Sequence, residues 1–148
     1  MRGLLIVAGS WLCFVVLSAQ AGDAVAVGYN AEGVWTVVTY YASSTPQGGT
    51  DYKNSAEARE TALRDIRRRA NEGVTKTGIL ASSDSTSYAA VARAETNAGK
   101  DVLVVGYGKS PAEAEKKATD DLKGHGATSK QKIMYRYFSN GADAAGGH

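Results

Sequence analysis

The chain has 148 residues, a length that fits one domain, with 17 Lys and Arg against 15 Asp and Glu, two His and one Cys. A formal net charge of +2 provides no electrostatic case for nucleic acid or acidic lipid as a partner, and a single cysteine excludes an intrachain disulfide scaffold.

The first 21 residues predict a secretory signal peptide. Met1-Arg2 is a positive start, Leu4–Leu17 is an apolar run, and Ala19-Gln20-Ala21 is a small-x-small site that predicts cleavage after Ala21. An uncleaved signal anchor is the alternative. Cys13 lies inside the apolar run, so the mature chain 22–148 contains no cysteine and has a charge near +1. No second segment is apolar enough to span a membrane, and we expect an exported protein, periplasmic or secreted.

The first half predicts two strands, a helix and a third strand. The short β-branched runs predict strands, and Asn54, three residues before Glu57, predicts a helix N-cap. The expected elements are strand 24–29, turn 30–33, strand 34–41, loop 42–52, a helix from Asn54 that ends before Gly73, and strand 74–81.

The second half repeats this order after a connector at 82–87. Ser110, Pro111 and Glu113 predict a capped helix with proline at its first position. The expected elements are strand 88–93, turn 95–100, strand 102–107, a helix from Ser110 to about Lys123, strand 132–138, and a frayed tail at 141–148.

Constant separations between matching residues indicate an internal repeat. Trp35 and Tyr40 match Val102 and Tyr107 at a separation of 67 residues, and the helix caps match at 56. The separations predict a tandem duplication of a ββαβ unit, with repeats at about 22–81 and 87–139 inside one domain at 22–140. The predicted fold class is α+β, a largely antiparallel sheet with two helices on one face.

The strand–strand order followed by an Ala-Glu-Ala-x-x-x-Ala helix, occurring twice behind a signal peptide, resembles the DUF4189 family of small exported bacterial domains. The resemblance covers most of the mature chain and implies secretion and a duplicated α+β fold, but no activity. Members of that family typically carry a cysteine late in each helix, where this chain has Arg and Gly.

The stretch 106–118 is also similar to the end of a double-stranded-RNA-binding domain, where a strand leads into a lysine-rich helix start. In this chain Pro111 and Ala112 occupy the helix start, and Lys116 and Lys117 lie further along. The near-neutral charge and the signal peptide argue against RNA binding. The similarity is better explained by the strand–turn–helix order that the two sequences share.

The mature chain lacks an obvious catalytic or metal-binding pattern. It has no Cys, and its two His are His125, between two glycines, and His148, the last residue. We therefore predict no catalytic residue, no metal ligand and no cofactor. A hydrolase that uses His125 as a general base is a weaker alternative.

Aromatic residues beside the long loop 42–52 suggest a recognition surface, although they could equally fill the core. The candidate binding residues are Trp35, Tyr41, Tyr52, Arg67 and Arg68, the two arginines lying at a helix end where cations also complement the helix dipole. The predicted function is a non-enzymatic binding or interaction domain whose expected partner is another protein or an envelope component. The alternative is a structural or stress-associated envelope protein that self-associates through a sheet edge.

Overall fold

The structure is a computed structural model that describes residues 22–42, 52, 54–128 and 130–139. The predicted signal peptide, residues 43–51 of the predicted loop and the predicted tail lie outside these residues. In chain order, the elements are β1 Asp23–Tyr29, β2 Trp35–Ala42, α1 Ser55–Arg67, a 3₁₀ turn Ala70–Glu72, β3 Lys76–Ser83, β4 Ser87–Glu95, β5 Asp101–Gly108, α2 Pro111–Gly124 and β6 Lys132–Ser139.

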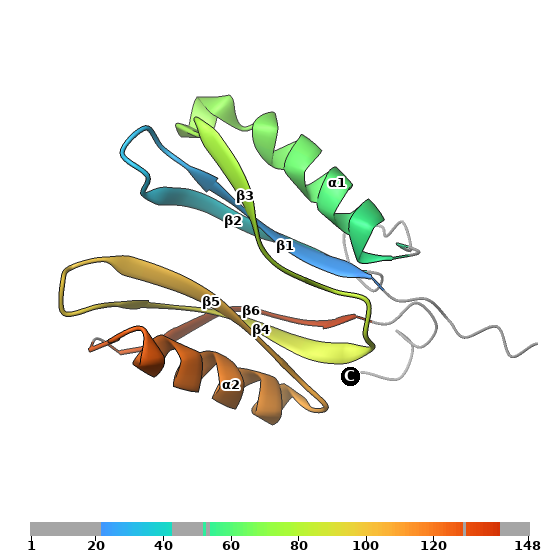
Figure 1. The fold of residues 1–148 in the computed structure, drawn as a ribbon, viewed down its shortest axis with the longest axis vertical. Coiled ribbons are helices and arrows are strands. Elements are labelled where there is room, and N and C mark those ends of the chain that lie inside the picture. Colours follow the sequence, from blue (N-terminus) through green and yellow to red (C-terminus); the bar gives the residue numbers. More distant parts are fainter. Residues whose placement is uncertain (1–21, 43–51, 53, 129, 140–148) are drawn as a thin grey trace, which may run out of the picture.

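The strands form two three-stranded antiparallel sheets, with strand order β2-β1-β3 in one and β5-β4-β6 in the other. Figure 1 shows four layers: α1, the first sheet, the second sheet and α2. The α+β class is therefore confirmed. The expectation of one sheet with both helices on one face is wrong, because each helix covers the outer face of a different sheet.

Two sheets form because the strands are apolar on both faces. One face of β1 carries Ala24 and Ala26, which pack under α1, and the other carries Val25, which faces the second sheet. A single sheet with helices on one side would leave that second apolar face in water. Stacking the sheets buries it, and β4 repeats the pattern with Ala90 toward α2 and Val91 toward the first sheet.

Both helices begin where the caps predict. The Asn54 side chain accepts a hydrogen bond from the Glu57 backbone N–H at 3.0 Å. At α2, the Ser110 hydroxyl oxygen accepts from the Glu113 N–H at 3.2 Å, while the Glu113 carboxylate accepts from the Lys109 N–H at 2.9 Å. These bonds satisfy backbone donors that the first helical turn leaves without partners.

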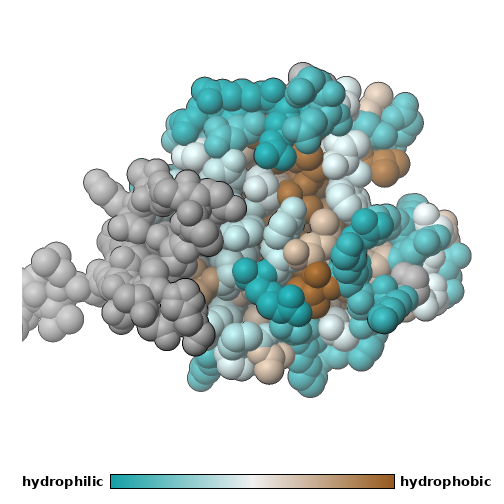
Figure 2. Space-filling view, turned by 180° about the vertical axis from the view of Figure 1, so that it is seen from behind, coloured by the Kyte–Doolittle hydropathy of each residue, from teal (hydrophilic) through white to brown (hydrophobic). Residues whose placement is uncertain are grey.

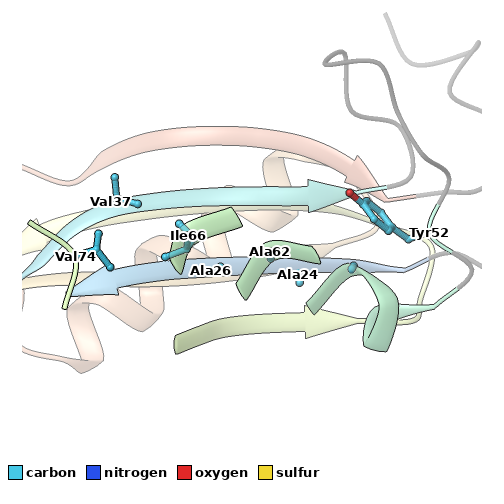
Figure 3. Close-up of a cluster of buried hydrophobic side chains, with 8 residues drawn as sticks. Ala24, Ala26, Val37, Tyr52, Ala62, Ile66 and Val74 are labelled. Carbon is cyan, nitrogen blue, oxygen red and sulfur yellow. The ribbon is translucent and has the colours of Figure 1, made fainter. Parts of the chain in front are cut away.

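Small residues let each helix lie close to its sheet. Figure 3 shows Ala24 and Ala26 of β1 beneath Ala62 and Ile66 of α1. Below α2 the approach is closer still, because β5 presents glycines. A Cβ built on Gly106 would stand only 2.3 Å from the carbonyl oxygen of Ala114, and one on Gly108 only 2.6 Å from its backbone nitrogen.

The two helices cover their sheets differently. Helix α1 packs across all three strands of its sheet, whereas α2 makes its main contacts with β5 and β4. The glycines of β5 draw α2 toward that edge of the sheet, because a helix can lie closest where no side chain separates it from the strand. The outer face of β6 is consequently left largely without a helix above it.

We expect Gly106→Ala to lower the free energy of unfolding by about 2–3 kcal/mol, because the new methyl group meets the backbone of α2 and the helix must move. The matched control is Gly124→Ala at the end of α2, where an added Cβ has nothing within 4 Å. Urea unfolding of both variants measures the difference; equal stabilities would contradict the close helix–strand contact.

Candidate functional site

A buried carboxylate ties the two sheets together. Asp23, at the start of β1, is fully buried, and its Oδ2 accepts hydrogen bonds from the hydroxyls of Tyr107 in β5 at 2.7 Å and Tyr137 in β6 at 2.5 Å. We call these three residues the inter-sheet tie. Tyr40 of β2 stacks flat on the Tyr137 ring, with centroids 4.6 Å apart. The tie therefore joins one sheet to the other through both hydrogen bonds and ring contacts.

Burial raises the pKa of the Asp23 carboxyl, and the hydroxyls of Tyr137 and Tyr107 oppose that rise by stabilising the ionised form. Burial and the nearby Asp23 carboxylate also raise the pKa of both tyrosines, so they remain hydroxyl donors. The second carboxylate oxygen, Oδ1, has no hydrogen-bond partner in the described part of the chain. Because Asp23 is closed off from solvent, we assign the tie to holding the sheets rather than to contacting a ligand.

A pocket, which we call the outer pocket, is formed by β4, β6 and the first residue of α2. Its volume is about 200 Å³. The lining residues are Tyr88, Ala89, Pro111, Arg136, Tyr137 and Phe138. The Tyr88 and Phe138 rings come from neighbouring strands and meet at a centroid distance of 4.6 Å. The pocket thus combines an aromatic wall with a proline rim at a helix start.

Arg136 stands at the rim of the outer pocket and is already paired. Its Nε lies 2.5 Å from Oε1 of Glu115 on α2, and the guanidinium lowers the pKa of that carboxyl. The pair is exposed, so it contributes little to stability. Its effect on the pocket is to neutralise the rim, which favours an uncharged occupant over an isolated anion.

Three of the five candidate residues predicted from the sequence gather around Asp65 of α1. Its Oδ2 accepts a hydrogen bond from the Tyr41 hydroxyl at 2.9 Å, and its Oδ1 lies 3.9 Å from Arg68. Tyr52 meets Tyr41 edge-to-face at 6.4 Å and is itself only 7% exposed. The two rings therefore pack in the core beneath α1, the second of the two roles that the sequence left open.

Trp35 lies on the other face of the first sheet. Strict alternation places it with Val37 and Tyr41, but a register shift pairs Tyr29 with Trp35 and Gly28 with Val37, so Thr36 is an extra residue. Such a bulge turns the side chains that precede it to the opposite face. Trp35 consequently packs between the sheets, separated from Tyr41 by the sheet itself.

At this end of the sheets, Arg93 of β4 covers the Trp35 ring, with the guanidinium carbon 5.1 Å from the ring centroid, and pairs with Asp101 at 2.8 Å. Arg67, the fifth candidate, is exposed near the end of α1. Figure 2 shows the molecule from behind. Its outer layers are hydrophilic, apolar residues are visible between them, and a notch separates the upper and lower layers at the end of the sheets.

His125 follows the last residue of α2, at the opposite end of the helix from the outer pocket, and its Nε2 lies 3.6 Å from Asp121 Oδ1. Across the described residues, no group of three or more His, Cys, Asp or Glu side chains is placed to hold a metal ion. None of the helices in that part of the chain has the length and apolar character to cross a membrane.

Sequence reasoning missed the outer pocket and the inter-sheet tie. The aromatic residues of β6 were visible in the sequence, but their partners were not, because Tyr88 and Tyr107 lie on other strands. Asp23 at the start of an apolar strand was the one local signal for a buried polar contact.

Comparison with protein-family models, with curated proteins and with solved structures finds no match to this chain.

The tie predicts an unusual pH dependence. Because the folded state raises the pKa of Asp23, the carboxyl contributes stability that is fully present below its unfolded pKa of about 3.9 and is lost as pH rises through the folded value. Asp23→Asn keeps an oxygen acceptor and removes the titration. We expect the free energy of unfolding of the wild type, relative to that of Asp23→Asn, to fall from pH 3 to pH 7. The fall is about 1.4 kcal/mol for each factor of ten by which the Asp23 carboxylate binds a proton more tightly in the folded than in the unfolded state.

The control is Asp84→Asn. The Ser55 backbone N–H donates to the exposed Asp84 carboxylate and lowers its pKa, so its contribution is present above the unfolded pKa and is lost as pH falls. Chemical unfolding at several pH values compares the two variants. A wild-type advantage over Asp23→Asn that grows with pH would show that burial does not dominate at Asp23.

Proposed function

We propose that this chain is an exported, non-enzymatic binding domain, and that its outer pocket receives one apolar or aromatic side chain of a partner protein. The observation that carries the proposal is the pocket itself, an aromatic-walled hollow of about 200 Å³ beside the first turn of α2, where that helix leaves β6 largely uncovered. Pockets for drug-sized ligands and cofactors span roughly 300–1,000 Å³. A smaller pocket suits a single side chain.

The chemistry of the pocket lining supports binding rather than catalysis. Tyr88, Pro111 and Phe138 provide apolar surface, and the Arg136 charge is balanced by Glu115. Acyl transfer or hydrolysis needs a nucleophile and a base within hydrogen-bond reach of each other. His125 lies at the other end of α2, roughly 20 Å from the pocket for a helix of this length.

The expectation of export rests on the leader at 1–21, and the resemblance to DUF4189 domains agrees with it. That assignment carries periplasmic or secreted localisation with it. A cysteine-free mature chain would need no oxidation step to fold after export, so its stability would depend on the three packed layers of apolar side chains.

We also infer that the two halves arose by tandem duplication. Besides the constant sequence separations, the contacts between the sheets are reciprocal: β2 contacts β6, and β3 contacts β5. If β1, β2 and β3 correspond to β4, β5 and β6, these two contacts are the same contact related by a two-fold axis. A duplicated unit that paired with its own copy would produce this arrangement.

The proposed binding site predicts where a partner will be cross-linked. A photo-reactive p-benzoylphenylalanine at Pro111, on the exposed rim of the outer pocket, should trap a discrete partner band in cells that produce the protein. The matched control is the same residue at Ser55, which holds the first helical position of α1 as Pro111 does in α2. Immunoblotting and mass spectrometry read the products.

A second change tests the pocket rather than its neighbourhood. Adding Phe138→Ala to the Pro111 cross-linker should reduce the partner band about tenfold, because the aromatic wall is removed. Circular dichroism establishes that this variant is folded. Equal trapping from Ser55 and Pro111, or trapping that Phe138→Ala leaves unchanged, would contradict the pocket as the recognition site.

A further inference from the structure

The edge of β5 differs from the other three sheet edges. Strands β2, β3, β5 and β6 lie at edges, and the pairing of β2, β3 and β6 with the central strands contains a register shift in each case. The pairing of β5 with β4 runs from Asp101 to Gly108 without one. Bulges and charged residues are the usual devices that prevent an edge strand from pairing with another chain. After Asp101, β5 has neither.

Strand β5 also has the composition of a pairing strand. Val102 to Val105 is an uninterrupted apolar run, and the side chains of Val102, Leu103, Val105 and Tyr107 are all partly exposed. Helix α2 covers the outer face of β5 but packs on that face through Gly106 and Gly108, so the outward row of backbone N–H and C=O groups is a separate surface.

We propose that the β5 edge pairs with the β5 edge of a second copy of this chain, in an antiparallel register that places Val105 opposite Val105. An antiparallel strand pair is self-complementary about a two-fold axis, so one edge supplies both halves of the interface. The result is a continuous six-stranded sheet made from the two copies of β5-β4-β6.

Charge complementarity selects this register. With Val105 on the two-fold axis, Asp101 comes opposite Lys109 of the second copy, the residue that directly follows the end of β5 at Gly108, and the same contact recurs on the other side of the axis. Oppositely charged residues facing each other across a strand pair stabilise it, and like charges destabilise it. Lys109 forms no ion pair within the described residues, and the Asp101 side chain is 26% exposed beside Arg93. A shift by one pair in either direction loses both contacts.

The packing of the same register is apolar on the face toward the other sheet. Leu103 lies opposite Tyr107 of the copy on the face toward the other sheet, which extends the apolar layer between the sheets. On the face toward α2, Val104 lies opposite Gly106, where the backbone of α2 already packs on the strand. The outer pocket is on the β6 side of the sheet, at the other edge, and this inference does not depend on it.

A cysteine at the two-fold axis tests the register directly. In the full chain carrying Cys13→Ser, Val105→Cys should form a disulfide-linked dimer under mild oxidation, since directly opposed antiparallel residues stand about 4.5–5.5 Å apart at Cα, within disulfide range. The control is Val102→Cys on the same strand, where the two cysteines would be roughly 20 Å apart. Non-reducing gels measure the linked fraction. No more linking at residue 105 than at residue 102 would overturn the proposal.

A charge reversal tests the same interface without a covalent bond. Lys109→Glu turns two opposite-charge pairs into two like-charge pairs and should weaken the dimer Kd about tenfold or more. Lys130→Glu makes the same charge change at an exposed residue outside β5 and should leave Kd unchanged. Sedimentation velocity over a concentration series measures both. A wild-type chain that is monomeric throughout, or equal association of the two variants, would exclude this pairing.

Discussion

The contact between the two sheets is the constraint on which the rest of the structure depends. Each central strand is apolar on both faces, so neither sheet is stable with a single helix covering one side. Stacking places each central strand between a helix and the opposite sheet. The inter-sheet layer also carries a polar contact: Asp23 enters it fully buried, and hydroxyls from two strands of the other sheet must reach it. Such a contact tolerates little sliding between the sheets, because a displaced tyrosine leaves a buried carboxylate unpaired.

The two halves share an order of elements but differ in how their helices are seated. At the separation of 67 residues, Thr39 and Tyr41 of β2 correspond to Gly106 and Gly108 of β5. Tyr41 fills the space between β2 and α1 and bonds to Asp65 on that helix, so α1 rests across the whole sheet. The glycines leave that space empty, and α2 descends toward β5. The side chain of Tyr41 thus accompanies a covered first sheet, and the glycines of β5 accompany a partly open second one.

Local signals in the sequence predicted the helices and strands well. The pairing of strands that are distant in the sequence could not be predicted in the same way. The caps at Asn54 and Ser110 were both predicted, since the start of a helix depends on residues only a few positions away. The third strand begins two residues later than expected, at Lys76. The division into two sheets was missed because alternation shows that a face is apolar but not what covers it. Trp35 was misplaced for a similar reason, since a bulge depends on the partner strand.

The same glycines determine which surfaces of the second sheet can meet a partner. By drawing α2 onto β5, they remove the outer face of that strand from solvent and leave only its edge, and they uncover the opposite margin at β6, where Tyr88 and Phe138 form a wall. The edge offers backbone hydrogen-bond groups in a straight row, whereas the pocket offers aromatic surface with a neutralised rim. Backbone pairing suits another extended strand, and an aromatic hollow suits a single inserted side chain. The two surfaces therefore suit different partners, and they involve different edge strands of one sheet, β5 and β6.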